Sequence, residues 1–266
     1  MSGSAVRFEK WEGLGNDFVV LEGVAMTPEG ARRLCDRRRG VGADGVLIVD
    51  RARPRMEVWN ADGSRPEMCG NGLRCVAAYL VSRGGPGEGL SIATDAGARR
   101  CDVAPAGGDD YEVLVEMGRA RLGEPLVVAA LGREHRFQSV DMGNPHAVTF
   151  EPYAEEAIDE VGPRVAAAPA EGVNVEFCRV GAPDAGGARR IDVTVWERGV
   201  GRTLACGTGA CAAAAAACEL GLAPFGAPIQ VTLPGGELGV TVAPGTRELS
   251  MRGPARRVFS GEVVIA

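Results

Sequence analysis

Two cysteines of the sequence stand in matched surroundings, 137 residues apart. Cys69 precedes Gly70-Asn71-Gly72, and Cys206 precedes Gly207-Thr208-Gly209. We expect a helix to begin after each cysteine, so that each thiol lies where backbone N–H groups without intrahelical partners and the helix dipole stabilise an anion. Such a position lowers the pKa of a thiol to roughly 3.5–7.5, and the same N–H groups can bind a carboxylate.

Two thiols of this kind can invert the configuration of a carbon acid. One cysteine, as a thiolate, removes a proton from one face of the carbon, and the other, as a thiol, returns a proton to the opposite face. The two helix N-termini would stabilise the negative charge that develops on the carboxylate of the substrate. The pair therefore predicts a racemase or epimerase that needs no cofactor.

The other cysteines and the histidines offer no second site. Cys75, Cys211 and Cys218 lie inside the expected helices, and we expect them to be buried packing residues. We expect the same of Cys35, Cys101 and Cys178, which belong to no catalytic or metal-binding motif of the sequence. No C-x-x-C motif occurs and the chain has only two histidines, so we predict no metal site. Free thiols without a disulfide framework indicate a reducing cytosol.

Three helices are expected from the sequence. After Gly72, apolar residues recur at positions 73, 76, 77, 80 and 81, which gives one apolar helix face. After Gly209, an alanine run of high helix propensity extends to about Leu220. Because its side chains are almost all small, we expect other elements to surround this helix on several sides. Thr27 and Pro28 supply an N-cap and a first-turn proline for a third helix.

The sequence also repeats at a larger scale. Short runs of β-branched and apolar residues, most of them separated by Gly or Pro, predict strands in both halves. Trp59 and Trp196 share the 137-residue offset of the cysteines, so each half comprises a strand, a loop, a cysteine, Gly-x-Gly and a helix. We therefore predict an α+β fold of two pseudo-symmetric domains, each a mostly antiparallel sheet wrapped around one central helix. The active site is expected in the cleft between the domains.

Composition and charge exclude several classes of protein. The chain has 266 residues and a net charge of -6, which argues against a nucleic-acid surface. The uncharged, mostly alanine run Thr203–Cys218 has 16 residues, fewer than the roughly 20 of a membrane-spanning helix. The N-terminus carries charge before any apolar stretch, so we expect no secretory signal and a cytoplasmic protein. Lys10 is the only lysine and lies outside any pyridoxal or P-loop context.

Several segments together resemble the diaminopimelate epimerases along nearly the whole chain. They are Gly13-Leu14-Gly15-Asn16-Asp17-Phe18, Asn60-Ala61-Asp62-Gly63-Ser64 with Met68–Gly72, Met142-Gly143-Asn144-Pro145-His146, Gly172-Val173-Asn174, and Trp196-Glu197-Arg198-Gly199 with Ala205–Ala210. The resemblance implies an isomerase that interconverts LL- and meso-diaminopimelate, a step toward lysine and, in many bacteria, toward cell-wall cross-links. It also implies that the last strand, Val258–Ile265, returns to the first domain. That domain would span 1–118 with 255–266, and the second would span 119–254.

The resemblance also implies roles for the residues that match the motifs of the family. Cys69 and Cys206 are expected to be the acid/base pair. The backbone amides expected to bind the reacting carboxylate are those of Gly70, Asn71, Gly207 and Thr208. The polar set expected to recognise the amino acid head groups is Asn16, Asn60, Asn144, Asn174, Glu197 and Arg198. Arg198 can bind a carboxylate bidentately and Glu197 an ammonium. His146 is expected to support the site, because the thiols already supply both proton-transfer groups.

One position varies within the family, and two asparagines each leave two interpretations open. Some members of the family carry a glutamine where this chain has Gly45, so a side-chain contact from that position is absent here. Asn16 and Asn60 suit substrate binding and also loop structure, because asparagines in loops cap turns and accept positive φ.

Other functions fit parts of the pattern. A proline or hydroxyproline racemase would share the duplicated cysteines, but it has no second amino acid centre to bind, so Trp196-Glu197-Arg198 favours diaminopimelate. The segment from Gly207 to Ala212 fits the dinucleotide pattern G-x-G-x-x-A, yet no acidic residue ends a strand about 20 residues later. A redox-sensing thiol module would form a reversible disulfide without turnover. We expect a small-molecule substrate and no nucleic-acid or membrane partner, and both a monomer and a homodimer remain open.

Overall fold

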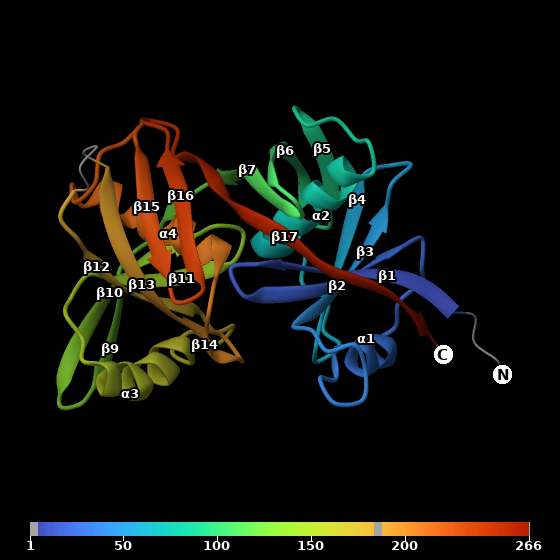
Figure 1. Ribbon diagram of the computed structural model, residues 1–266. Coiled ribbons are helices and arrows are strands. Elements are labelled where there is room, and N and C mark those ends of the chain that lie inside the picture. Colours follow the sequence, from blue (N-terminus) through green and yellow to red (C-terminus); the bar gives the residue numbers. More distant parts are fainter. Residues whose placement is uncertain (1–4, 184–187, 266) are drawn as a thin grey trace. The chain divides into compact units, whose positions relative to one another are not determined.

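The computed structural model describes residues 5–183 and 188–265, and the chain divides into two compact units of mixed helices and strands (Figure 1). Unit 1 comprises Met1–Val115 with Gly253–Ala266, and unit 2 comprises Glu116–Arg252. The domain limits derived from the sequence, 1–118 with 255–266 and 119–254, stay a prediction.

Unit 1 is built on a closed ring of strands. They are β1 (Ala5–Gly13), β2 (Asn16–Glu22), β3 (Gly45–Asp50), β4 (Arg55–Asn60), β5 (Leu90–Thr94), β6 (Gly97–Gly107), β7 (Asp110–Arg119) and the later part of β17 (Glu248–Val264). The pairs β2–β3 and β4–β5 are parallel, whereas β1–β2, β3–β4, β5–β6 and β6–β7 are antiparallel. Because β17 pairs with both β7 and β1, the ring closes.

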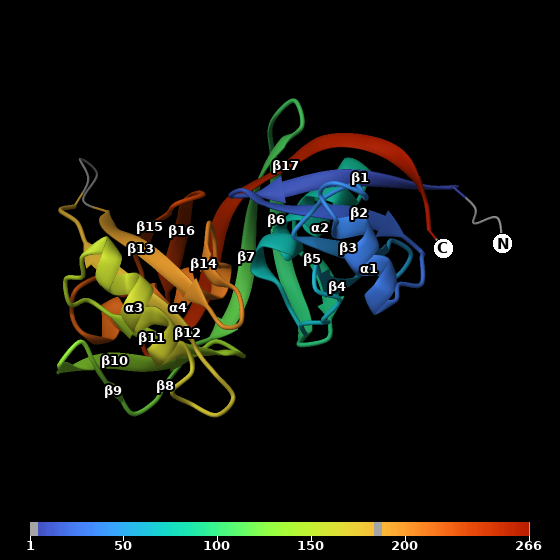
Figure 2. The ribbon, with the colours of Figure 1, turned by 90° about the horizontal axis from the view of Figure 1, so that it is seen from below.

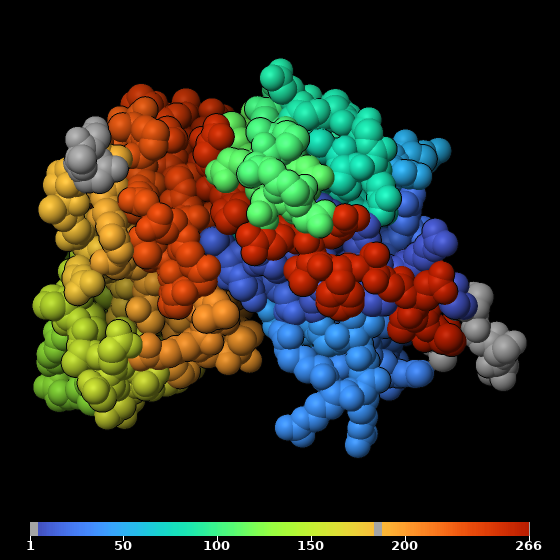
Figure 3. Space-filling model, in the orientation of Figure 1, coloured from blue at the N-terminus to red at the C-terminus, as the bar shows by residue number. Residues whose placement is uncertain are grey.

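The pairing of β17 with β1 is visible in two views. The strands run side by side in the ribbon (Figure 2), antiparallel from Ala5 opposite Val264 to Glu12 opposite Arg256. In the space-filling view this end of β17 lies on the surface of unit 1 (Figure 3). The predicted strand Val258–Ile265 is therefore the end of a longer strand that begins at Glu248.

Helix α2 (Gly70–Ser82) lies within the ring of unit 1. All its residues from Gly70 to Leu80 are buried, and it contacts β1, β2, β3, β4 and β6. Helix α1 (Pro28–Cys35) packs on β3 and β4, and Thr27 caps it, since its Oγ1 accepts a hydrogen bond from Gly30 N at 3.1 Å. Both helices begin where the sequence predicts.

Unit 2 repeats the order of unit 1 (strand pair, helix, strand pair, helix, strand pair) and has the further strands β8 (Arg121–Leu122), β9 (Leu126–Ala130) and β14 (Gly201–Thr203). Its other strands are β10 (Arg133–Asp141), β11 (Pro145–Thr149), β12 (Asn174–Val180), β13 (Arg189–Glu197), β15 (Pro228–Leu233), β16 (Gly236–Val242) and the start of β17. The pairs β11–β12 and β13–β15 are parallel, and β10–β11, β12–β13, β15–β16 and β16–β17 are antiparallel.

The central helix of unit 2 is the alanine-rich segment. Helix α4 (Gly207–Glu219) is buried from Gly209 to Cys218 and contacts β10, β11, β12, β13, β15 and β16. The small side chains let strands approach it from several directions, as predicted. Helix α3 (Glu155–Ala166) packs on β9, β12 and β13.

The two units share one core arrangement of strands and helices. Helices α2 and α4 each have 13 residues, and their first residues are separated by the 137-residue offset of the two cysteines. The parallel pair β2–β3, joined through α1, corresponds to the parallel pair β11–β12, joined through α3. The predicted α+β fold, with two pseudo-symmetric halves around central helices, is confirmed.

Helix α3 is absent from the sequence prediction for a physical reason. Its N-cap, Ala154, makes no side-chain hydrogen bond, and Pro163 lies inside the helix. Capping side chains and the absence of proline are the usual local signals of a helix. Across the two described ranges, 5–183 and 188–265, no helix is both long enough and apolar enough to cross a membrane.

A charged cluster in unit 1 contains the single lysine. Lys10 Nζ lies 2.6 Å from Asp17 Oδ2 and donates a hydrogen bond to the carbonyl oxygen of Gly42. Arg37 Nη2 lies 2.7 Å from Oδ1 of both Asp17 and Asp44. Burial alone would raise the pKa of Asp17, but hydrogen bonds from Arg37 and Lys10 hold it well below its usual value. The cluster ties the start of β2 to the loop before β3.

Replacing Lys10 by Met is expected to destabilise the protein by about 2 kcal/mol, because the Asp17 carboxylate loses its buried cation and keeps only Arg37, whose side chain is 58% exposed. The Lys10 side chain is only 6% exposed, so water cannot take the place of the ammonium. Arg7→Met is the matched control, since the side chains of Arg7 and Glu262 are 91% and 61% exposed and little change is expected. Thermal unfolding measures both variants, and an unchanged Tm for Lys10→Met would show that the cluster adds no net stability.

Candidate active site

Each of the two predicted catalytic cysteines is the N-cap of a central helix. Cys69 precedes α2 with φ -138° and ψ 117°, and Cys206 precedes α4 with φ -125° and ψ 108°. The sulphur atom of each accepts a backbone hydrogen bond, from Gly72 N and Gly209 N respectively, at 3.4 Å. A thiol thus takes the position usually held by Ser, Thr, Asp or Asn, where the helix start favours an anion.

The two thiols differ in their surroundings. Cys69 is half-buried, whereas Cys206 is buried. Burial raises the pKa of Cys206 well above its usual value, the carboxylates of Glu197 and Glu176 raise it further, and the Thr208 hydroxyl has a smaller lowering effect. The prediction of a lowered pKa is therefore wrong for Cys206. Desolvation outweighs the helix N-terminus, and the thiol is the favoured form.

The ends of β12 and β13 bring together three of the predicted binding residues. Asn174 Oδ1 accepts a hydrogen bond from the backbone N–H of Arg198 at 2.9 Å. Glu197 Oε1 accepts one from the Thr203 hydroxyl at 2.6 Å, and Arg198 Nη1 donates to the carbonyl oxygen of Glu171 at 2.7 Å. Asn174 therefore fixes the turn after β13 that carries the two charged side chains.

A second group of side chains leads from Cys206 into the interior of unit 2. Thr208 Oγ1 lies 3.5 Å from Cys206 Sγ, and Asn144 Nδ2 donates to Thr208 Oγ1 at 3.4 Å. Asn144 Oδ1 lies 3.1 Å from His146 Nε2, and His146 Nδ1 lies 2.7 Å from Glu176 Oε1. These contacts join Cys206 to Thr208, Asn144 and His146, which were expected at the site. They also include Glu176, which was not expected there.

Glu176 is the member of this group that the sequence reasoning missed. Its side chain and that of His146 are both 0% exposed. The signal was a single carboxylate in the otherwise uncharged run Val173–Cys178. A charged residue on a strand covered on both faces is buried only with a partner, so it could have been paired with the buried histidine.

The predicted binding residues of unit 1 lie at strand ends and at the start of α2. Asn16 begins β2, and within the described part of the chain no donor reaches its buried Oδ1. Asn60 ends β4 and donates from Nδ2 to Ser64 Oγ at 2.9 Å. Asn71, the second residue of α2, is 2% exposed. Among the described residues the buried Asn16 oxygen thus has no donor, whereas Asn60 also shapes its own loop.

Gly45, the first residue of β3, has no room for a side chain. A Cβ atom there would lie 2.8 Å from the carbonyl oxygen of Trp59 and 3.3 Å from the ring of Phe18. A backbone oxygen in a paired strand cannot turn away as a flexible side chain can. Any residue with a side chain would therefore need a different local backbone at this position.

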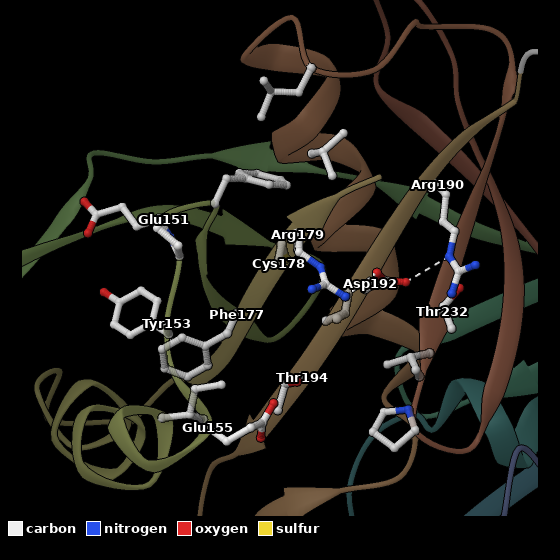
Figure 4. Close-up of a pocket in the computed structure, with 18 residues that line it drawn as sticks. Glu151, Tyr153, Glu155, Phe177, Cys178, Arg179, Arg190, Asp192, Thr194 and Thr232 are labelled. Carbon is white, nitrogen blue, oxygen red and sulfur yellow. Dashed lines mark hydrogen bonds and ion pairs between the residues drawn. The ribbon is translucent and has the colours of Figure 1, made fainter. Parts of the chain in front are cut away.

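A surface hollow of about 730 Å³ in unit 2 is separate from these groups (Figure 4). Its labelled polar residues include Glu151, Arg179, Arg190 and Asp192, and Arg190 Nε donates to Asp192 Oδ1 at 2.9 Å. None of the site residues predicted from the sequence lines this hollow. We therefore place the candidate active site at the N-termini of α2 and α4 and at the strand ends that carry the predicted binding residues, and not in this hollow.

Comparison with known proteins identifies the family. The family model described as diaminopimelate epimerase matches residues 8–123 and 138–258. The chain is 40% identical over 279 residues to the diaminopimelate epimerase of Desulfitobacterium hafniense (strain DSM 10664 / DCB-2), covering 95% of this chain and 96% of the relative. It is 41% identical over 288 residues to the protein of the same name from Synechococcus sp. (strain JA-2-3B'a(2-13)), covering 96% of each.

Solved structures of lower sequence identity share the fold. A probable proline racemase from Agrobacterium radiobacter K84 has a TM-score of 0.73 at 17% identity, covering 98% of this chain and 93% of that one. A hydroxyproline epimerase from Agrobacterium vitis has a TM-score of 0.72 at 19% identity, covering 99% and 92%. The proline racemase alternative thus shares the architecture but lies far away in sequence. From the family match and the identities of 40% and 41% over nearly the full length, the chain belongs to the diaminopimelate epimerase family and is an isomerase.

Proposed function

We propose that the protein interconverts LL- and meso-diaminopimelate, with Cys69 and Cys206 as its two proton-transfer groups and without a cofactor. The observation that carries this proposal is the pair of matched thiols, each the N-cap of a buried helix of 13 residues. Inversion of a carbon centre needs a proton to leave one face and another to reach the opposite face. The product supplies lysine synthesis and cell-wall precursors. A cytoplasmic location, and either a monomer or a homodimer, stay predictions.

In each direction one cysteine starts as a thiolate and the other as a thiol. The thiolate takes the α-proton, and the electron pair of the broken C–H bond moves into the α-carboxylate. The thiol then gives its proton to the opposite face of the carbon, and the electron pair returns to form the new C–H bond. The protonation states of the cysteines have then been exchanged. Because burial raises the pKa of Cys206, this residue suits the thiol role in the resting enzyme.

The charge on the reacting carboxylate needs hydrogen-bond donors that are already in place. The first backbone N–H groups of α2 belong to Gly70 and Asn71, and those of α4 belong to Gly207 and Thr208. N–H groups in the first turn of a helix have no intrahelical acceptor, and together with the helix dipole they favour an anion. We assign these amides to the reacting carboxylate, where they stabilise the charge of the transition state.

The second amino acid centre needs groups that bind both an ammonium and a carboxylate. Glu197 supplies a carboxylate for the ammonium, and Arg198 supplies a guanidinium for the carboxylate, on a turn that Asn174 holds. Asn16 offers a buried carbonyl oxygen, which suits an ammonium N–H. Asn60 and Asn144 complete the set. Proline has a single amino acid centre, so this set favours diaminopimelate.

Hydrogen exchange at the inverted carbon tests the two-base mechanism. In deuterated water, product formed early from LL-diaminopimelate is expected to carry deuterium at that carbon, because the donating thiol has already exchanged with solvent. Recovered substrate should carry very little, since the abstracting thiol would return the original hydrogen. Proton NMR at low conversion measures both. The distal centre should stay unlabelled because the binding set holds it away from the thiols.

The same experiment can contradict the proposal. A single base that moves from one face to the other would pass the hydrogen of the substrate to the product. Predominantly unlabelled early product would therefore rule out separate roles for Cys69 and Cys206. L-Proline serves as the control substrate, and inversion of L-proline but not of LL-diaminopimelate would contradict the assignment of the substrate.

A further inference from the structure

The buried pair of His146 and Glu176 has no part in the reaction as proposed. His146 lies on β11 and Glu176 on β12, two parallel strands in which Val148 is opposite Glu176. Since side chains alternate along a strand, the two residues share one sheet face. That face is turned toward α4, because a Cβ atom at Gly209 would lie only 2.6 Å from Glu176 Oε1. The carboxylate thus lies against the first turn of the helix that Cys206 caps.

Stability alone does not account for a carboxylate at this position. The other oxygen, Glu176 Oε2, is buried and has no hydrogen-bond partner in the described ranges 5–183 and 188–265. A buried acceptor without a donor costs free energy, and a buried ion pair is often no more stabilising than an apolar pair of the same size. A role in the site explains the retained charge better than packing does.

The contacts from Glu176 to Cys206 form a chain in which each hydrogen bond constrains the next. An ionised carboxylate only accepts, so His146 must carry a proton on Nδ1 to bond Glu176 Oε1 at 2.7 Å. The other ring nitrogen, Nε2, then lies toward Asn144 at 3.1 Å, and Asn144 contacts Thr208 at 3.4 Å. Thr208 ends the chain 3.5 Å from Cys206 Sγ, where oxygen or sulphur can be the donor.

With the Asn144 amide as it stands, the chain is complete for a thiolate on Cys206. His146 is then an imidazolium that donates from Nδ1 to Glu176 and from Nε2 to Asn144 Oδ1. Asn144 Nδ2 donates to Thr208 Oγ1, and the Thr208 hydroxyl is free to donate to the sulphur. Each contact of the chain then has one donor and one acceptor, and the imidazolium is neutralised by Glu176.

With the Asn144 amide turned over, the same chain is complete for a thiol on Cys206. The S–H donates to Thr208 Oγ1, the Thr208 hydroxyl donates to the amide oxygen, and the amide nitrogen donates to a neutral His146 at Nε2. His146 Nδ1 still donates to Glu176. The hydrogen bond from His146 Nδ1 to Glu176 is therefore the same in both arrangements, whichever way the other hydrogen bonds point.

We propose that Glu176 is a positioning residue for Cys206: by keeping a proton on His146 Nδ1, it lets the hydrogen-bond chain serve Cys206 both as a thiol and as a thiolate. The inference rests on the proposed function of Cys206 and adds a residue to it. A glutamine at position 176 would lack this property, because its amide can also donate to His146 Nδ1. The ring could then carry its proton on Nε2, and the chain for the thiol would be broken at Asn144.

The test uses Glu176→Gln, which keeps the shape of the side chain and removes its charge. The chain has only two histidines, so ¹⁵N NMR of histidine-labelled protein resolves His146, assigned by its loss in His146→Gln. Wild-type His146 is expected to carry a proton on Nδ1, and in Glu176→Gln a neutral ring with the proton on Nε2 should appear. We expect kcat to fall about 10- to 100-fold, as for other groups that orient a reacting residue, with a smaller change in KM.

Three controls separate positioning from a structural effect. His135 is the internal reference, since its ring contacts Tyr153 Oη and Ala130 O, at 2.7 and 3.0 Å, and its signals should not change. Glu176→Asp, which again only accepts, should restore the Nδ1 proton and part of kcat. In the His146→Gln background, Glu176→Gln should lower kcat no further, because Glu176 acts through His146.

Each opposite outcome overturns the proposal. A proton on Nε2 alone in the wild type would overturn it even if the glutamine variant failed to fold. An unchanged His146 ring in Glu176→Gln would also overturn it, as would a changed ring with unchanged kcat or a further loss in the double variant. Failure of the proposed function would be distinguishable, because it would appear as retained activity in Cys206→Ala while the His146 signals still followed Glu176.

Discussion

Epimerisation of LL-diaminopimelate is expected to fall by about 10²- to 10⁴-fold when either Cys69 or Cys206 is replaced by Ala, the range for loss of a general acid or base. Each direction of the reaction needs one thiolate and one thiol at the same time, so one remaining cysteine cannot complete the inversion. The loss should appear in kcat, measured by optical rotation or by a coupled assay for meso-diaminopimelate. Both variants should fold, because the backbone N–H groups of the helix starts are unchanged.

The neighbouring cysteines of the same helices are the matched controls. Cys75 in α2 and Cys211 in α4 are both 0% exposed, inside the helices rather than at their caps. Alanine at either position removes a small buried side chain and should lower the Tm while turnover continues. Full activity in Cys69→Ala or Cys206→Ala would contradict the two-thiol mechanism.

The second large effect is expected at Gly209, in the first turn of α4. An added Cβ would lie 2.6 Å from Glu176 Oε1 and 3.3 Å from Cys206 Sγ. Glu176 is fully buried and bonded to His146, so it cannot withdraw without breaking that contact. We expect Gly209→Ala to destabilise the protein by about 2 kcal/mol through overpacking, and to lower kcat about 10- to 100-fold by displacing the sulphur.

The equivalent glycine of unit 1 gives the comparison. An added Cβ at Gly72 would lie 2.9 Å from a methyl group of Leu47, the far end of a flexible side chain, and 3.6 Å from Cys69 Cβ. Alanine favours a helix over glycine by about 1 kcal/mol at both positions, and at Gly72 this gain offsets the milder crowding. Gly72→Ala should therefore lose little Tm and much less kcat than Gly209→Ala. Equal losses in the two variants would show that the buried carboxylate has no special part in the effect.

The catalytic pair and its helices could be predicted because their signals are local. A cysteine before Gly-x-Gly, an apolar face or an alanine run, and a repeat at 137 residues all lie within short stretches of chain. The backbone geometry that follows from them is the same for Cys69 and Cys206. The mixed fold of two similar halves follows from the same repeat.

What the sequence could not provide depends on contacts between distant residues. The raised pKa of Cys206 comes first from burial, which a helix start does not reveal. The pairing of Glu176 with His146 needs the register of β11 with β12, and the pairing of Lys10 with Asp17 needs the β1–β2 hairpin. These are tertiary effects between residues that lie apart in the chain.

The ring of unit 1 has a consequence for the order of events during synthesis. Its strands β1 to β7 leave the ribosome first, but β17, which pairs with both β1 and β7, emerges only after unit 2 has been made. Until then β1 and β7 present unpaired edges, which are prone to pair with other chains. Pairing between segments so far apart in the chain also slows folding. The half of the protein that is translated first is therefore the last to be completed.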